Sequence, residues 1–256
     1  MELRATFDTV AEIYDAVRPG YPEPLFDDIA AMVGLGPGDP VLEVGCGSGQ
    51  ATESLYARRY AITALDPGPA LIAAARRRFA DAHDVAFVIS RFEDWVAPAQ
   101  GYRLVAAAQS WHWTPQARAF AGAALALRPD GWLAVFGSCP VRYPPWFLAA
   151  AKPLYMRHAP ELWGPPSESW YLPQGPVSGL FAGSGWFAPA THRAYPWIWP
   201  HTAESYRAFL RSRSDFNGIA EPRREALIDA LAEAIVAHGG ELEIGYESHL
   251  YLAAAV

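Results

Sequence analysis

The stretch that decides the fold reads Pro40-Val41-Leu42-Glu43-Val44-Gly45-Cys46-Gly47-Ser48-Gly49-Gln50-Ala51-Thr52. The apolar run before the first glycine predicts a short buried strand, and a helical pattern follows from about Ala51. Glycine suits the turn between them, because a chain that reverses so tightly visits φ > 0 and must let a ligand approach the backbone. The amides at the start of a helix favour an anionic or polar group. The stretch therefore predicts a strand, a glycine turn and a helix that are suited to holding a ligand.

Two features of this stretch depart from the dinucleotide-binding pattern G-x-G-x-x-G. The third glycine, Gly49, comes one residue early, and Gln50 occupies the expected glycine position. Glu43 lies inside the predicted strand, and an acid in a buried strand requires a partner. These features disfavour a nicotinamide oxidoreductase. They leave open a tight turn without a ligand and a site for another nucleotide.

The segment from Glu43 to Gly49 resembles motif I of the class I S-adenosylmethionine (SAM) dependent methyltransferases, which reads Glu/Asp-x-Gly-x-Gly-x-Gly. Within this class, the chain resembles the small-molecule group that includes trans-aconitate methyltransferase and methyltransferase type 11, a resemblance carried by the lead-in Tyr14-Asp15-Ala16-Val17-Arg18-Pro19-Gly20-Tyr21-Pro22. The resemblance implies an α/β fold, namely a Rossmann-like doubly wound seven-stranded sheet in the order 3-2-1-4-5-7-6 with the last strand antiparallel. It also implies SAM as the cofactor, S-adenosylhomocysteine (SAH) as the product, and contacts to the methionine end from Glu43, Gly45, Cys46, Gly47 and Gly49.

Composition narrows the class of protein. The chain has 256 residues, of which 52% are hydrophobic, so we expect one domain, residues 1–256, with a sizeable core. It holds no apolar run of about 18 residues and no apolar stretch like that of a signal peptide, so we expect a cytoplasmic protein without a membrane contact. The net charge of −7, with arginines spread along the chain, argues against nucleic acid as a partner. Cys46 and Cys139 are too few for a metal cluster, and we expect no metal.

The N-terminal segment, residues 1–38, is expected to cover the cofactor with helices over residues 5–16 and 23–33. Residues 14–22 resemble the lead-in Y-D-x-x-R-P-x-Y-P of the same methyltransferase group. That resemblance implies that Tyr14 and Arg18 lie near the methionine carboxylate and the substrate entrance. The alternative is a core tyrosine and a surface arginine, because a helical pattern alone predicts the same residues.

The SAM-binding core is expected over residues 39–137, and Asp66 marks its second strand. Residues 61–65 predict that strand, which ends in Asp66-Pro67, 17 residues beyond Gly49. An acid at this place is suited to accept hydrogen bonds from both ribose hydroxyls, and Pro67 lies beside it. The alternative is that Asp66 only caps the next helix, predicted over residues 69–82.

The third strand, residues 85–89, leads into the loop Ser90-Arg91-Phe92-Glu93-Asp94-Trp95. Relatives often carry an acid here that binds the adenine amino group. Arg91 stands where that acid is common. The resemblance therefore implies that Phe92 and one of the acids after it, Glu93 or Asp94, contact the adenine, and we assign Glu93.

The fourth strand, residues 104–108, delivers Gln109-Ser110-Trp111-His112-Trp113 to the carboxyl edge of the sheet, where open α/β sheets bind ligands. This segment resembles the H-W segment of the same group, and we assign Gln109 to the cofactor. His112 is the candidate base or orienting group, since its unperturbed pKa suits proton transfer. It could instead hydrogen-bond the cofactor or the loop without moving a proton.

The fifth strand is expected over residues 132–136 after a turn over residues 128–131, and residues 138–190 then break the alternation of strands and helices. A long connection of this kind is often a lid or a binding element. Its aromatic side chains could pack a small helical cap or line a substrate pocket. The expected substrate contacts, two of them beside His112, are Trp111, Trp113, Tyr143, Trp146 and Trp170.

The closing part, residues 191–256, predicts strands over residues 191–199 and 246–254 with two helices between them, residues 202–213 and 222–237. The whole pattern predicts a SAM-dependent methyltransferase that modifies a small apolar or aromatic molecule at an O, N or C nucleophile. The protein is expected to act as a monomer or a homodimer. The alternative is a protein that binds SAM without methyl transfer, because cofactor motifs do not report on the second substrate.

Overall fold

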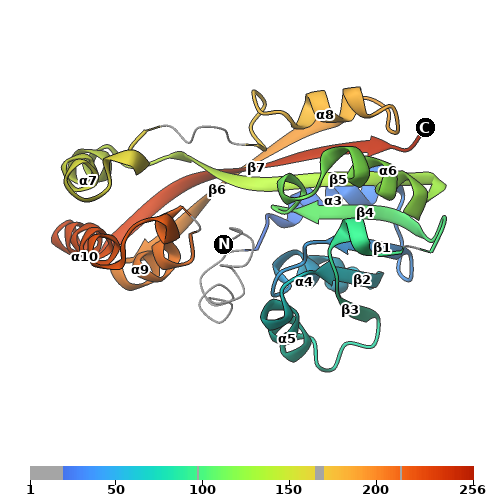
Figure 1. The fold of residues 1–256 in the computed structure, drawn as a ribbon, viewed down its shortest axis with the longest axis horizontal. Coiled ribbons are helices and arrows are strands. Elements are labelled where there is room, and N and C mark those ends of the chain that lie inside the picture. Colours follow the sequence, from blue (N-terminus) through green and yellow to red (C-terminus); the bar gives the residue numbers. More distant parts are fainter. Residues whose placement is uncertain (1–19, 97, 165–169, 214) are drawn as a thin grey trace. The chain divides into compact units, whose positions relative to one another are not determined.

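The computed structural model describes residues 20–96, 98–164, 170–213 and 215–256, and these divide into two compact units (Figure 1). The core unit comprises the described residues within 20–139, 169–195 and 248–256. The helical unit comprises the described residues within 140–168 and 196–247. The division of the chain into four functional segments stays a prediction.

Seven strands form one sheet in the order β3-β2-β1-β4-β5-β7-β6, with the last strand antiparallel. The strands are β1 (Pro40–Val44), β2 (Ala61–Asp66), β3 (Val85–Ile89), β4 (Tyr102–Ala108), β5 (Leu127–Arg142), β6 (Thr191–Thr202) and β7 (Glu241–Ala254). β1 pairs in parallel with β2 and with β4, so that Val41 lies between Ile62 and Leu104. The predicted fold class is confirmed.

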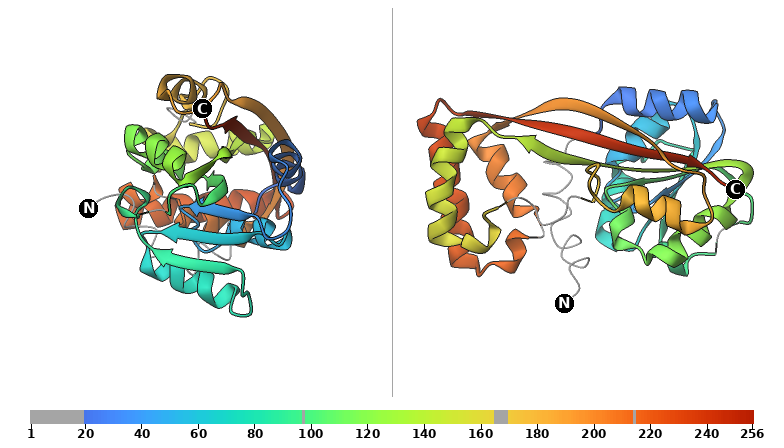
Figure 2. Two further views of the ribbon diagram at one scale, coloured as in Figure 1. Left: turned by 90° about the vertical axis from the view of Figure 1, so that its right-hand side faces the viewer. Right: turned by 90° about the horizontal axis from the view of Figure 1, so that it is seen from above.

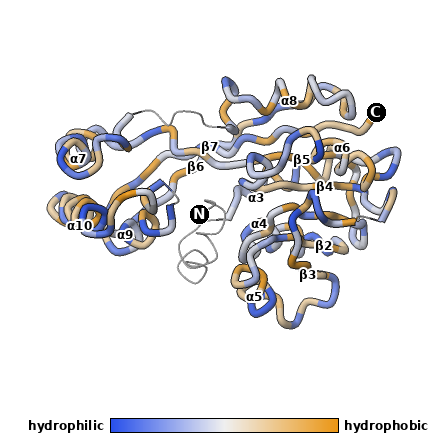
Figure 3. Tube along the Cα trace, viewed as in Figure 1, coloured by the Kyte–Doolittle hydropathy of each residue, from blue (hydrophilic) through white to orange (hydrophobic). Residues whose placement is uncertain are grey.

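The central strands are apolar because helices cover both faces of the sheet. Neighbouring residues of β1 belong to different hydrophobic clusters, Leu42 to one and Val41 to the other. Along β4, residues 104–108 are coloured mostly as hydrophobic in Figure 3. The helices of the core unit are α3 (Glu23–Val33), α4 (Gln50–Ala57), α5 (Pro69–Arg78), α6 (Gln116–Ala126) and α8 (Val177–Ser184). Phe26 of α3 and Phe120 of α6 lie in these two separate clusters, which places α3 and α6 on opposite faces.

Three helices dominate the helical unit: α7 (Pro145–His158), α9 (Ala203–Arg211) and α10 (Glu221–Ala237). Helix α10 buries Leu227, Ile228, Leu231 and Ile235, whose spacing gives one apolar stripe. This stripe packs against α7 and α9, and the three helices lie together in the right-hand view of Figure 2. Short 3-10 helices cover residues Phe92–Asp94, Trp111–Trp113, Pro160–Leu162 and Phe216–Gly218.

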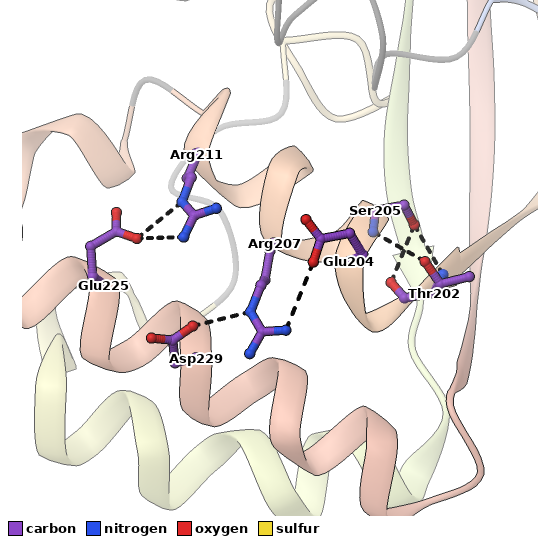
Figure 4. A network of polar contacts seen from close by, with 7 residues as sticks. All are labelled: Thr202, Glu204, Ser205, Arg207, Arg211, Glu225 and Asp229. Carbon is purple, nitrogen blue, oxygen red and sulfur yellow. Dashed lines mark hydrogen bonds and ion pairs between the residues drawn. The ribbon is translucent and has the colours of Figure 1, made fainter.

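Polar contacts join α9 to α10 and define where α9 begins (Figure 4). Thr202 and Ser205 form a capping box, in which each side chain accepts a hydrogen bond from the other residue's backbone amide. Arg207 Nε lies 3.0 Å from Asp229 of α10, and Arg211 Nη2 lies 2.7 Å from Glu225. Such partly exposed pairs contribute little to stability, so the apolar stripe holds the helices together.

Some predicted boundaries were wrong. The predicted turn over residues 128–131 lies within β5, as an irregularity at which the pairing with β4 passes from Tyr102–Leu127 to Leu104–Trp132. The last strand begins at Glu241, five residues before the predicted start, because Gly239 and Gly240 at φ 108° and 89° reverse the chain directly after α10. The helix predicted over residues 5–16 lies outside the described residues.

Candidate functional site

The three glycines after β1 all have left-handed backbones, with φ of 71° at Gly45, 57° at Gly47 and 101° at Gly49. A Cβ on Gly45 would lie 2.4 Å from Cβ of Ser110, and one on Gly49 would lie 2.6 Å from the ring of Phe79. A Cβ on Gly47 would meet nothing nearer than 3.8 Å. Packing therefore demands glycine at the first and third positions, while the middle one leaves space beside the backbone.

Asp66 ties the glycine turn to the end of β2. One carboxylate oxygen accepts a hydrogen bond of 3.0 Å from the amide of Gly47, and the other accepts one of 2.8 Å from Gly68. The carbonyl of Leu65 accepts from the amides of both Gly45 and Cys46. The acid is thus placed beside the open face of Gly47, and the ribose contact that we predicted for it stays a prediction. Pro67 follows directly and is exposed.

Glu43 is buried below the turn, with 1% of its surface exposed. Thr52 donates a hydrogen bond of 2.6 Å to Oε2, and Oε1 has no hydrogen-bond partner among the described residues. Burial raises the pKa of Glu43 to about 8, and the charge of Asp66 adds to this rise. A positively charged ligand group beside Oε1 would satisfy the oxygen and favour the ionised carboxylate.

Gln109 and Ser110 connect the ends of three strands. Gln109 has φ of 54°, and its side chain pairs with the backbone of Ser138, accepting from the amide at 2.8 Å and donating to the carbonyl at 3.4 Å. Ser110 Oγ donates to the carbonyl of Val44. The side chain of Gln109 therefore holds β5 beside β4, and the cofactor contact that we predicted for it stays a prediction.

Phe92 and Trp111 pack against each other inside the core unit, with ring centroids 6.0 Å apart. Phe92 is 8% exposed, and Glu93 next to it is half-buried. Trp111 is fully buried and also packs on Phe120 at 5.4 Å. The structure thus places Trp111 in the apolar core. The aromatic side chains of the next two residues in the sequence are only half-buried.

His112 lies in an aromatic group at the carboxyl end of β4. Its Nδ1 is 2.9 Å from the hydroxyl of Tyr171, and its ring centroid lies 4.8 Å from that of Trp113 and 6.0 Å from that of Trp170. We call His112, Trp113, Trp170 and Tyr171 the His112 group. Trp113 and Trp170 are half-buried, so this group reaches the surface of the core unit.

The other predicted site residues lie elsewhere. Tyr143 and Trp146 belong to the helical unit, where Trp146 stacks on His238 at 4.0 Å. Tyr14 and Arg18 lie outside the described residues. Burial raises the pKa of the Cys46 thiol, which keeps it protonated. Among the described residues no group of three or more His, Cys, Asp or Glu could hold a metal ion.

Sequence reasoning missed Thr52, Ser110 and Tyr171. Thr52 carried a usable signal, because a hydroxyl in the first turn of the helix after the glycines can reach back to an acid in the strand before them. Tyr171 lies 59 residues from His112, and no local pattern connects the two.

The sequence matches the methyltransferase domain family over residues 41–131, the part that contains the glycine turn, Asp66 and the His112 segment. A relative from Schizosaccharomyces pombe, named as an uncharacterised methyltransferase-like protein, is 26% identical over 253 residues, which cover 95% of this chain and 93% of that protein. Residues 41–131 are a methyltransferase domain, and the chain has the fold of the class I SAM-dependent methyltransferases. Uncharacterised methyltransferases of Mycobacterium tuberculosis and Mycobacterium bovis are 28% identical to this methyltransferase over 132 residues, about half of each chain.

Solved structures share the fold of this methyltransferase. A protein of Anaeromyxobacter dehalogenans, named as a type II methyltransferase, superposes with a TM-score of 0.62 at 23% identity and covers 93% of this chain and 97% of its own. Phosphoethanolamine N-methyltransferase 2 of Haemonchus contortus, solved with phosphomonomethylethanolamine and SAH, superposes with a TM-score of 0.54 at 12% identity. That match covers 96% of this chain and 57% of the other. At such identities the likeness shows the fold alone.

The cofactor of this methyltransferase is SAM. The residues of the glycine turn fit such a group: Gly47 leaves room beside its backbone, and Glu43 offers a buried oxygen without a partner among the described residues. A cationic ligand with a polar tail matches both features, because SAM carries a sulfonium and an ammonium.

Proposed function

We propose that this methyltransferase transfers the methyl group of SAM to an O, N or C nucleophile of a small apolar or aromatic molecule. The observation that carries the substrate class is the His112 group, in which three aromatic rings surround one polar side chain. Small-molecule sites are mostly apolar and hold a few polar groups that orient the ligand. Aromatic faces also stabilise cations such as a sulfonium.

For the cofactor, the contacts that we propose follow the motifs of the chain. Glu43 and the turn with Gly45, Cys46, Gly47 and Gly49 hold the methionine end. The ribose lies at Asp66 and Pro67, and the adenine at Phe92 and Glu93. Tyr14, Arg18 and Gln109 complete this set. The unpartnered Oε1 of Glu43 and the open face of Gly47 support the first part of the proposal.

Bound SAM supplies a methyl group activated by the adjacent sulfonium. Little acid or base power is then required of the chain, whose residues mainly hold the nucleophile in line with the methyl group and exclude water. His112 serves as a base or as a hydrogen-bonding group for the nucleophile. Trp113 and Trp170, which are half-buried beside His112, line the substrate site in the core unit.

Location and partners are also proposals. We propose a cytoplasmic protein that acts as a monomer or homodimer and does not bind nucleic acid. The net charge of −7 and the scattered arginines support the last point. Among the described residues, no helix is long and apolar enough to cross a bilayer.

Calorimetric titration with SAM, SAH and NAD tests the cofactor part. We expect both sulfur ligands to bind and NAD to give no heat of binding. Incubation with methyl-labelled SAM and a panel of phenols, carboxylates, amines and sugars tests the substrate part. Label transfer to an aromatic acceptor with formation of SAH supports the proposal. Transfer to the sugars alone would overturn the substrate class.

A further inference from the structure

Tyr171 contacts His112 from a part of the chain far away in sequence. Its hydroxyl lies 2.9 Å from Nδ1 of His112, and the two rings meet at 83°. Tyr171 is 2% exposed, whereas His112 is half-buried. Tyr171 thus engages Nδ1 of the half-buried imidazole, and Nε2 is the ring nitrogen that it does not hold.

The surrounding chain holds Tyr171 in place. The hydroxyl of Tyr251 donates to the carbonyls of Tyr171 at 3.0 Å and of Leu172 at 3.1 Å. A Cβ on Gly137 would lie 2.5 Å from Cδ2 of Tyr171, so the ring packs directly on the backbone of β5. Packing and hydrogen bonds therefore hold the phenol oxygen in one position in the core unit, and from there it orients the imidazole.

The chemistry of the two groups sets the favoured direction of the hydrogen bond. Burial raises the pKa of Tyr171 well above its ordinary value, so the phenol keeps its proton. A phenol O–H is a stronger hydrogen-bond donor than a neutral imidazole N–H, and an imidazole nitrogen is a stronger acceptor than a phenol oxygen. At a separation of 2.9 Å, the favoured bond therefore runs from the Tyr171 hydroxyl to an unprotonated Nδ1.

We propose that Tyr171 is a positioning residue that donates its hydroxyl proton to Nδ1 of His112 and so holds the imidazole with its proton on Nε2. His112 then offers an N–H donor to the acceptor molecule and is not the base. This inference rests on the proposed function for the role of His112 toward substrate. The hydrogen bond itself does not depend on that function.

Proton–nitrogen correlation spectra of the full chain, labelled with nitrogen-15 at histidine, test the direction. The His112 signals are assigned by their absence in His112→Gln. We expect the nitrogen-15 chemical shift of Nδ1 to be that of an unprotonated nitrogen and the chemical shift of Nε2 to be that of a protonated one. Both should hold in the free protein and with saturating SAH. A protonated Nδ1 at neutral pH would overturn the proposal. The wild-type spectrum alone decides this point, whether or not any Tyr171 variant folds.

Tyr171→Phe removes only the hydroxyl and tests whether Tyr171 sets the tautomer. We expect the two His112 nitrogens to move toward averaged shifts, as in a mixture of tautomers. Tyr102→Phe is the matched control, because Tyr102 is also buried in the core unit and donates to Thr63 at 3.1 Å. The control should keep the wild-type shifts. Unchanged His112 signals in folded Tyr171→Phe would contradict the proposal.

The role toward substrate is tested on the acceptor of the panel that is turned over fastest. A glutamine side chain can donate an N–H but is no base, so His112→Gln should keep kcat within about tenfold of wild type. His112→Phe, which lacks a donor, should lose about a hundredfold. Equal losses in both variants would overturn the donor role while leaving the tautomer result intact. Failure of wild type to bind SAM or SAH would instead refute the proposed function.

Discussion

Thr52 donates a hydrogen bond of 2.6 Å to one oxygen of Glu43, while the other oxygen has no hydrogen-bond partner among the described residues. Burial raises the pKa of this carboxyl to about 8, so at neutral pH the free protein carries it mostly protonated. The site thus holds a proton that a cationic ligand would displace. This links the binding of SAM to pH.

We expect SAM binding at pH 7 to release close to one proton, because a cation beside Glu43 favours the ionised carboxylate. The affinity for SAM should accordingly rise with pH up to about 8 and then level off. Calorimetry at pH 7 in two buffers with different ionisation enthalpies measures the release. Glu43→Gln is the control and should show a smaller release. The same observed heat in both buffers for wild type would refute the linkage.

Asp66→Asn is expected to weaken SAM binding by about tenfold to a hundredfold, the range for a hydrogen bond to a charged acceptor. Asp39→Asn is a matched control, since Asp39 also accepts from a backbone amide, that of Gly36 at 2.8 Å, but lies before β1. Its affinity for SAM should equal that of wild type. Retained affinity in Asp66→Asn would move the ribose contact to another residue.

Gly47→Ala and Gly49→Ala should fail in different ways. At Gly49 the added Cβ forces the ring of Phe79 away from Tyr56 and Phe87, so we expect a loss of about 1–3 kcal/mol in unfolding free energy. At Gly47 only the left-handed backbone opposes alanine, at about 1 kcal/mol, but the methyl group occupies the space beside the turn. Urea unfolding and SAM titration separate the effects. Gly47→Ala should lose more free energy of SAM binding than free energy of unfolding. Full affinity for SAM in this variant would argue against a ligand at this face.

His201 makes the helical unit sensitive to acid. It is 1% exposed, neither ring nitrogen has a hydrogen-bond partner among the described residues, and burial lowers its pKa to about 4. The unfolded chain, with an ordinary pKa near 6.5, binds the proton more readily, so stability falls as the pH drops from about 6.5 to 4. Between pH 7 and pH 5 this contribution is at most about 2 kcal/mol.

Urea unfolding of wild type and His201→Phe at both pH values measures this effect. The variant should lose less stability on acidification, because phenylalanine cannot bind a proton. His83→Gln changes an exposed histidine and should behave as wild type. An equal pH dependence in wild type and His201→Phe would show that other groups cause the acid sensitivity.

Local patterns predicted much of the core unit. The run Val41-Leu42 and the following glycines predicted β1 and its turn, and Asp66 was expected at the end of β2, where the structure has it. Irregular elements were harder to predict from local sequence patterns. The proline and glycine of residues 128–131 predicted a turn, and the structure has an irregularity within β5 there, because only the flanking residues Leu127 and Trp132 pair with β4. The local turn preference was therefore read correctly as a break in the pairing, whereas the continuation of the strand on both sides depends on the neighbouring strand.

The sequence by itself determined the cofactor motif and the positions of Glu43 in β1, Asp66 at the end of β2 and His112 after β4, because strand ends and glycine turns follow from a few neighbouring residues. Only the tertiary structure decided which side chains meet. Thr52 reaches Glu43 because the glycine turn folds the helix back over its strand. Tyr171 reaches His112 across 59 residues because that later segment packs on the backbone of Gly137. Such contacts depend on close packing between segments that are distant in the sequence. No local periodicity of the sequence encodes that packing.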